Sequence, residues 1–268
     1  MKLSIVLSTQ PASFSALAYK GNIEENIKQI KKLGYDGVEL AVRNPNEVDV
    51  EYVKSILEEN NLPVPAVGTG QAFGEEGLSF THGDPRIRRK AIERIKDQIT
   101  FSKNFDAVVI IGLVRGIVGQ DEDRNQAYKN MLTAFDECAS FDENVKIVIE
   151  PINRYETNLL NTVEQTLQFI DELGKPNVGL LLDTFHMNIE EPNIVESIKN
   201  AKDKIFHFHV ADSNRWHPGA GHINFYEIYE TLQRLNYDGF VSAEILPMPD
   251  PDVAAANNIK YLKKVFAS

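Results

Sequence analysis

Cysteine and long apolar runs are both scarce in this chain. Cys138 is the single cysteine among 268 residues, which excludes an intrachain disulfide framework, and its place in a helical pattern favours an inert core thiol. No stretch approaches the ~18 consecutive apolar residues that a membrane-spanning helix needs. The apolar run from Leu3 to Leu7 is too short for a signal peptide, so we expect a cytoplasmic protein.

Positively charged residues are also fewer than negatively charged ones. The chain carries 28 lysines and arginines against 39 aspartates and glutamates, a net charge of −11 that repels phosphate backbones and argues against nucleic acid as a partner. A charged fraction of 25% and a hydrophobic fraction of 43% are ordinary for a soluble globular enzyme. No Gly-, Ser- or Pro-rich linker divides the sequence, so we expect residues 1–268 to form one domain.

Eight short runs rich in Val, Ile, Leu and Phe alternate with helical patterns along the whole length. Each run is bounded by turn residues, which is typical of strands covered on both faces. Strands are predicted at 3–8, 36–41, 64–69, 106–112, 145–150, 178–183, 204–210 and 239–245. Helices are predicted at 23–33, 47–60, 85–103, 122–141, 162–173, 193–201, 225–235 and 252–266.

Local signals support several of these boundaries. Asp84 followed by Pro85 is a favourable helix start, and Gly34 and Gly174 stand where a helix should end. Eight consecutive βα units predict fold class α/β, a single (β/α)8 TIM barrel with its active site at the carboxyl ends of the strands. An open doubly wound sheet is the alternative, but no GxGxxG phosphate fingerprint follows an early strand.

The last four predicted strands each end in a residue that can bind a hard metal ion, namely Glu150, Asp183, His209 and Glu244. Side chains alternate along a strand, so matched parity would turn all four into one ring at the barrel mouth. Oxygen and imidazole ligands without a thiolate suit Mn²⁺, Co²⁺ or Mg²⁺, whereas closed structural zinc sites favour cysteine. Taken singly, each carboxylate could instead be a helix N-cap or a surface residue.

The same alternation makes predictions for neighbouring positions. His207 lies one layer deeper than His209 and is expected to be a hydrogen-bonded core histidine rather than a ligand. The apolar residues of opposite parity should face the surrounding helices: Phe206, Phe208, Val241 and Ala243.

Around these residues the sequence resembles the sugar isomerase/epimerase superfamily of xylose isomerase-like barrels, most closely its ketose 3-epimerase branch of D-tagatose and D-psicose 3-epimerase types. The similarity runs nearly end to end, and the spacings between its motifs agree as well. Its most specific segments are 149–156 (IEPINRYE), 182–188 (LDTFHMN), 207–215 (HFHVADSNR), 218–221 (PGAG) and 243–244 (AE).

The resemblance implies a metal-dependent epimerase. Glu150, Asp183, His209 and Glu244 would hold one divalent metal ion per chain, usually Mn²⁺ in such epimerases, with Co²⁺ or Mg²⁺ as alternatives. Glu150 and Glu244 would double as the acid/base pair. The implied reaction inverts C3 of a free ketohexose or ketopentose through a cis-enediolate, which agrees with two carboxylates that can exchange protons with opposite faces of the sugar.

The resemblance also assigns Glu156, His186 and Arg215 to the oxygens around C1, C2 and C3 of an open-chain ketose. Each has a plainer interpretation from the residues alone. Arg215 could pair with Asp212, His186 could cap a loop, and Glu156 could be a solvated loop residue.

Two features depart from the family pattern. Relatives often carry aromatic residues at the barrel mouth that pack on the sugar, but the first and fourth strands here end at 7–8 and 112–113 without one. Phe14 and Trp216 are the candidates for such a surface. The glycine loop at 218–222 lacks the lysine of many relatives. The chain length of the sugar is therefore left open.

Other functions could use a similar barrel. An aldose–ketose isomerase, a hydroxypyruvate isomerase or a sugar-phosphate epimerase would keep the same metal ring, although a phosphosugar enzyme should show a basic cluster. An apurinic-site endonuclease would hold three zinc ions and need extra histidines at 67–69 and 111–113, where there are none. A non-enzymatic sugar-binding protein would not need both glutamates. The expected partner is a small sugar, with no membrane or nucleic acid, and relatives of this kind form homodimers or homotetramers.

Overall fold

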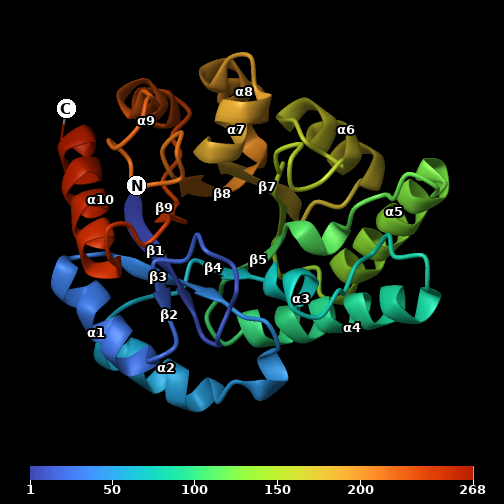
Figure 1. The fold of residues 1–268 in the computed structure, drawn as a ribbon, viewed down its shortest axis with the longest axis horizontal. Coiled ribbons are helices and arrows are strands. Elements are labelled where there is room, and N and C mark those ends of the chain that lie inside the picture. The colour runs from blue at the N-terminus through green and yellow to red at the C-terminus, as the bar shows by residue number, and fades with distance from the viewer. Residues whose placement is uncertain (268) are drawn as a thin grey trace.

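Eight parallel strands form a closed barrel in the computed structural model, which describes residues 1–267 (Figure 1). They are β1 (Lys2–Ser8), β3 (Gly37–Ala41), β4 (Ala66–Gly68), β5 (Val108–Ile111), β6 (Ile147–Ile149), β7 (Val178–Asp183), β8 (Ile205–Val210) and β9 (Phe240–Ala243). Strand β1 pairs with both β3 and β9, which closes the sheet. The predicted (β/α)8 barrel is confirmed. Ser268, the last residue of the predicted domain, lies outside the described residues.

Eight longer helices surround the barrel and connect its strands (Figure 1). They are α1 (Ile23–Leu33), α2 (Val50–Glu59), α4 (Pro85–Ser102), α5 (Arg124–Phe141), α6 (Val163–Leu173), α8 (Ile194–Ala201), α9 (Phe225–Arg234) and α10 (Pro251–Phe266). Asp84 caps α4 through its side chain, and Gly34 and Gly174 end α1 and α6 at φ values of 89° and 65°, as predicted. Across residues 1–267, none of the helices is long and apolar enough to cross a membrane.

Several short elements were not expected from the sequence. They are β2 (Tyr19–Lys20), α3 (Gln71–Gly74), α7 (Thr184–Glu190) and the 3₁₀ turns η1 (Pro45–Glu47), η2 (Leu113–Arg115) and η3 (Lys202–Lys204). Elements of one or two turns are too short to show a hydrophobic period. Most of them lie in loops at the carboxyl ends of strands, where the active site of such a barrel is built.

Two of the three apolar clusters among the described residues form the outer and inner cores of the barrel. The larger core fills the space between the sheet and the helices. The smaller core lies inside the barrel and is made by Ala66, Ile110, Val148 and Leu181. Because side chains alternate along a strand, Val148 and Leu181 share a face with the residues two positions further on, Glu150 and Asp183. Apolar side chains thus fill the interior while polar side chains occupy its carboxyl end.

Phe206 packs on the core inside the barrel, so the prediction that it faces the helices is wrong. The register between β7 and β8 shifts at this point, since Leu180 pairs with Ile205 but Leu181 pairs with His207. This irregularity leaves Phe206 without a partner and reverses its direction, as a β-bulge does. The other three apolar residues belong to the outer core, as predicted: Phe208, Val241 and Ala243.

The inward turn of Phe206 makes Gly179 sensitive to substitution. A Cβ at Gly179 would lie 2.5 Å from Cδ2 of Phe206 and 2.7 Å from the backbone oxygen of Lys204. We expect Gly179→Ala to lower the free energy of unfolding by about 1–3 kcal/mol through overpacking, measured by urea denaturation. Gly70→Ala is the matched control, because no atom lies within 4 Å of its added Cβ and its φ is −56°. Equal stability of the two variants would contradict the expectation.

Candidate active site and metal centre

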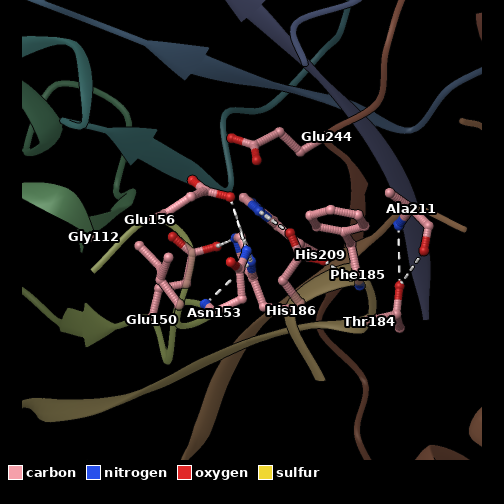
Figure 2. A network of polar contacts seen from close by, with 12 residues as sticks. Gly112, Glu150, Asn153, Glu156, Thr184, Phe185, His186, His209, Ala211 and Glu244 are labelled. Carbon is pink, nitrogen blue, oxygen red and sulfur yellow. Dashed lines mark hydrogen bonds and ion pairs between the residues drawn. The ribbon is translucent and has the colours of Figure 1, made fainter. Parts of the chain in front are cut away.

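Glu150, Asp183, His209 and Glu244 converge at the carboxyl end of the barrel. Figure 2 shows Glu150, His209 and Glu244 of this group. Glu150 directly follows β6, Asp183 ends β7, His209 lies on β8 and Glu244 directly follows β9. Each side chain offers one ligand atom, and these four atoms all lie within 4.8 Å of one another. Asp183 and His209 are register partners, so their closeness follows directly from strand pairing.

The ends of β7 and β8 are locked together beside these residues. Asp183 uses Oδ1 to cap α7, accepting from the backbone N–H of Phe185 at 2.7 Å. The Thr184 hydroxyl donates to the Ala211 carbonyl at 2.6 Å and accepts from the Ala211 N–H at 3.0 Å (Figure 2). Asp183 is therefore both an N-cap and a site residue, with one oxygen assigned to each role.

Three atoms of the cluster are buried without a hydrogen-bond partner among the described residues: Glu150 Oε1, Asp183 Oδ2 and His209 Nδ1. Buried polar atoms are almost always satisfied, so such a group requires an explanation. All three are electron-pair donors that converge on one point, and a cation there would satisfy them together. The residues present therefore fit a divalent metal ion.

The acidity of the cluster leads to the same conclusion. Burial raises the pKa of Glu150 well above its usual value, and the nearby carboxylate of Glu244 adds to the rise. Burial also raises the pKa of Asp183 and of Glu244, although Arg215 opposes both shifts. Three carboxylates in one place, two of them buried and one half-buried, repel one another, and a divalent cation would remove that repulsion.

Glu39 on β3 supports His209 from the side away from the cluster, and sequence reasoning missed it. Its carboxylate contacts Nε2 of His209 at 3.0 Å and Nε2 of His207 at 2.8 Å. His207 is thus a hydrogen-bonded core histidine, as predicted. Since Nε2 of His209 carries the proton shared with Glu39, its Nδ1 is left to bind a metal ion. Burial opposes ionisation of Glu39, but the two imidazoles lower the pKa of its carboxyl group.

We expect Glu39→Gln to weaken Mn²⁺ binding about 10–100-fold, measured by isothermal titration calorimetry. A glutamine has one carbonyl oxygen and no charge, so it cannot accept from both imidazoles or hold His209 in one orientation. Asp36→Asn is the control, because Asp36 precedes the same strand and accepts from the backbone of Leu3 instead. An affinity within twofold of the parent protein would count against this role for Glu39.

Arg215 lies inside the site rather than on Asp212. Its guanidinium donates to Glu244 Oε2 at 2.7 Å and to Glu156 Oε1 at 3.1 Å. The rings of Phe185 and Phe14 flank it, with centroids 4.6 and 5.2 Å from the guanidinium carbon. Burial opposes its charge, but the surrounding carboxylates raise the pKa of Arg215 further, so it stays positive.

The loop that presents Arg215 is held by Asp212. The Asp212 carboxylate accepts from the backbone N–H groups of Ser213, Gly219 and Ile223, at 2.8, 2.8 and 3.1 Å. Arg215 itself has a φ of 61°, a conformation that is uncommon for a residue other than glycine. Asp212 therefore shapes the loop, while the guanidinium is left free to reach the carboxylates.

His186 and Glu156 meet through Asn153 (Figure 2). The amide nitrogen of Asn153 contacts His186 Nδ1 at 2.8 Å and Glu156 Oε1 at 2.8 Å. Since an amide N–H donates, Nδ1 of His186 accepts and its Nε2 carries the hydrogen, 3.7 Å from Glu150 Oε1. Burial lowers the pKa of His186 well below its usual value, so the ring is neutral and presents one donor to the site.

A pocket opens above these residues and includes much of the predicted site. Its lining contains Glu150, Glu156, His186, His209, Arg215 and Glu244. Phe14 also lines it, as expected of an aromatic surface for the sugar, but Trp216 is not among the lining residues. The remainder is largely apolar, with Leu17, Ile110, Leu113 and Ile152 on its wall.

Comparison with known proteins places the chain in a family. Residues 27–265 match the xylose isomerase-like TIM barrel family, and the chain belongs to it. An L-ribulose 3-epimerase from Methylomonas sp. is 30% identical over 85% of this chain and 80% of its own length. A 3-dehydro-D-guloside 4-epimerase from Escherichia coli is 28% identical, with 96% and 98% covered. A crystal structure of a D-allulose 3-epimerase from Methylomonas sp. superposes with a TM-score of 0.83 at 26% identity, covering 98% of both chains. Several further curated relatives are ketose 3-epimerases, which are carbohydrate epimerases.

Proposed function

We propose that this protein is a metal-dependent epimerase that inverts C3 of an unphosphorylated ketohexose or ketopentose. The observation that carries the proposal is the placement of Glu150 and Glu244. Glu150 is buried and Glu244 is half-buried. The two carboxylates reach the same small site from different sides and offer atoms within 4.8 Å of each other (Figure 2). Similarity to ketose 3-epimerases supports the same assignment.

The chemistry required is removal and return of a weakly acidic proton beside a carbonyl group. One glutamate takes the C3 proton, which leaves a cis-enediolate, and the other delivers a proton to the opposite face of C3. Burial raises the pKa of both groups in the metal-free site, whereas the charge of a bound cation would lower it. Either glutamate can begin the reaction, so the enzyme runs in both directions.

The other predicted residues bind and polarise the substrate. A divalent cation held by Glu150, Asp183, His209 and Glu244 would supply Lewis-acid stabilisation of negative charge on the sugar oxygens. Arg215 keeps a positive charge in the site, and neutral His186 directs an N–H donor from Nε2 into it. Glu156, tied to both through Asn153 and Arg215, accepts from a sugar hydroxyl.

The character of the pocket favours a free sugar over a sugar phosphate. Arg215 is the one arginine or lysine among the lining residues, and it is already engaged by two carboxylates. The acidic side chain of Glu75 also lines the pocket, where it would repel a phosphate group. Phosphate recognition ordinarily uses several arginines, lysines or helix N-termini.

Deuterium exchange tests this proposal directly. L-Ribulose and D-allulose are incubated with the protein and Mn²⁺ in D₂O, and both recovered epimers are examined by NMR. We expect deuterium at C3 together with conversion to L-xylulose or D-fructose. Deuterium confined to C1 would identify an aldose–ketose isomerase, and inversion at C4 would instead match the activity named for the Escherichia coli relative.

We further propose manganese as the resident ion, a cytoplasmic location and a homodimeric or homotetrameric assembly, without nucleic-acid or membrane partners. The oxygen and imidazole donors suit manganese. The net charge of −11 disfavours nucleic acid. Metal analysis of the purified protein and light scattering check the first and third of these.

A further inference from the structure

Arg115 is a completely buried arginine next to the site, and neither the proposed reaction nor the pocket uses it. It ends the turn η2 after β5 and has 0% of its surface exposed. Within the described part of the chain, its guanidinium forms four hydrogen bonds, all to backbone carbonyls. The acceptors are Glu150 at 2.6 Å, Leu159 at 3.0 Å, Gly112 at 3.2 Å and Leu160 at 3.3 Å. Buried arginines are ordinarily paired with carboxylates, so this arrangement needs a reason.

The four carbonyls belong to three separate segments of the barrel mouth. Gly112 directly follows β5, and Glu150 directly follows β6. Leu159 and Leu160 lie beyond Glu156 in the loop after β6, and Leu160 has an unusual φ of 52°. One rigid guanidinium therefore links three backbone segments that lie beyond the last paired residues of β5 and β6, where the Glu150 N–H still donates to the Ile111 carbonyl at 3.4 Å.

The contact between Gly112 and Glu150 shows why this spacing matters. A Cβ at Gly112 would lie 2.9 Å from Glu150 Oε2 and 3.2 Å from Cδ1 of Ile152. The Glu150 carboxylate is thus seated directly against the Gly112 backbone (Figure 2). Any change in the distance between the two backbones would move the carboxylate.

The arginine also remains charged. Burial lowers the pKa of Arg115 to about 10, and the acidic groups of Glu150 and Glu156 oppose the fall. At neutral pH the guanidinium therefore keeps all its donors. A lysine would retain the charge but has three donors on a single atom, so it cannot span the same carbonyls.

We propose that Arg115 is a positioning residue for the acid/base chemistry, because it holds the backbone of Glu150 against Gly112 and so aims the carboxylate at one face of the sugar. This inference rests on the proposed function. It differs from a general structural role because it predicts damage to proton transfer on one face only, the face that Glu150 serves.

Arg115→Lys and Arg115→Gln test the proposal at saturating Mn²⁺. We expect kcat to fall about 10–100-fold, as is typical when the support of a site residue is lost, with KM within about threefold. Misplacement of Glu150 leaves Glu244 working. The epimer that Glu244 deprotonates should still form the enediolate and take up deuterium from D₂O without converting. Its ratio of deuterium uptake to conversion should rise at least tenfold. The ratio for the opposite epimer should not rise, because its return step uses Glu150 and its conversion step uses Glu244.

Arg124→Gln is the matched control. Arg124 is exposed at the start of α5 and donates to the Asn158 carbonyl at 2.7 Å, in the same loop that Arg115 anchors. Its loss should leave both ratios and kcat within twofold of the parent. Thermal unfolding and Mn²⁺ titration show that each variant is folded and loaded.

Equal ratios for the two epimers, or an unchanged kcat, in the Arg115 variants would overturn the positioning role. If neither variant folds, Gly112→Ala decides the matter, because its Cβ displaces the carboxylate while Arg115 stays intact. A one-sided rise in the ratio supports the proposal, and equal ratios reject it. Absence of C3 exchange in the parent protein would instead overturn the proposed function.

Discussion

Glu150→Gln should lower kcat for C3 epimerisation by about 10²–10⁴-fold, the usual contribution of a positioned general acid or base. Glutamine keeps the size of the side chain and one carbonyl oxygen, but it cannot accept the C3 proton. Glu244→Gln should cause a loss in the same range, since each turnover needs one carboxylate on each face. The measurement is the initial rate of D-allulose or L-ribulose conversion at saturating Mn²⁺.

The two variants should differ from each other in isotope exchange. With Glu150→Gln, deuterium should still enter the epimer whose C3 proton faces Glu244, and with Glu244→Gln it should enter the other epimer. Glu143→Gln is a suitable control, because Glu143 is exposed in the loop before β6 and has no role in the proposed site. More than a tenth of the parent kcat in either active-site variant, with the metal bound, would show that this glutamate is not an essential base.

Local sequence patterns were sufficient to predict which residues lie at the ends of the strands in this site. Strand parity is a property of the chain itself, so Glu150 and Asp183 could be assigned to the inner face before any pairing was known. Most helix boundaries are set by caps that can also be read in the sequence, such as Asp84 with Pro85. The fold follows from many such local signals that agree with one another.

The residues that sequence reasoning missed depend on contacts between distant segments. Glu39 is a lone acid on an early strand, and its partners His207 and His209 are about 170 residues away. Its inward parity and its apolar neighbours were the available signal. Arg115 has no sequence signature for its role, because its partners are backbone carbonyls. The reversed direction of Phe206 comes from a register shift between two strands, which neither strand reveals alone.

Removal of the metal is expected to abolish activity and to lower stability together. Dialysis against a chelator should reduce turnover to below about 1%, and Mn²⁺ or Co²⁺ should restore it. An ion that binds only the folded protein stabilises the fold by about 2.7 kcal/mol when its free concentration is 100 times its dissociation constant. Addition of Mn²⁺ should therefore raise the melting temperature by several degrees, and this readout does not depend on catalysis. Undiminished turnover after chelation would contradict the assignment.

Asp183→Asn separates the metal-binding role of Asp183 from its structural one. The variant keeps an oxygen that can cap α7 at the Phe185 N–H, but an amide nitrogen replaces Oδ2, the oxygen that is buried without a partner. We expect the melting temperature of the metal-free variant to stay within about 2 °C of the metal-free parent, while the rise caused by Mn²⁺ disappears. Equal metal-induced rises in both proteins would mean that Oδ2 does not bind the ion.

The pH dependence of binding gives an independent check on the same cluster. Burial raises the pKa of Asp183, Glu150 and Glu244, so the metal-free site holds protons at a pH where solvated carboxyls have lost them. Those protons must leave before the oxygens can bind a cation, so the affinity for Mn²⁺ should fall as the pH is lowered. Calorimetry in buffers of different ionisation enthalpy should detect proton release on binding. An affinity for Mn²⁺ that does not change between about pH 5 and about pH 8 would show that these carboxyl groups are not the ligands.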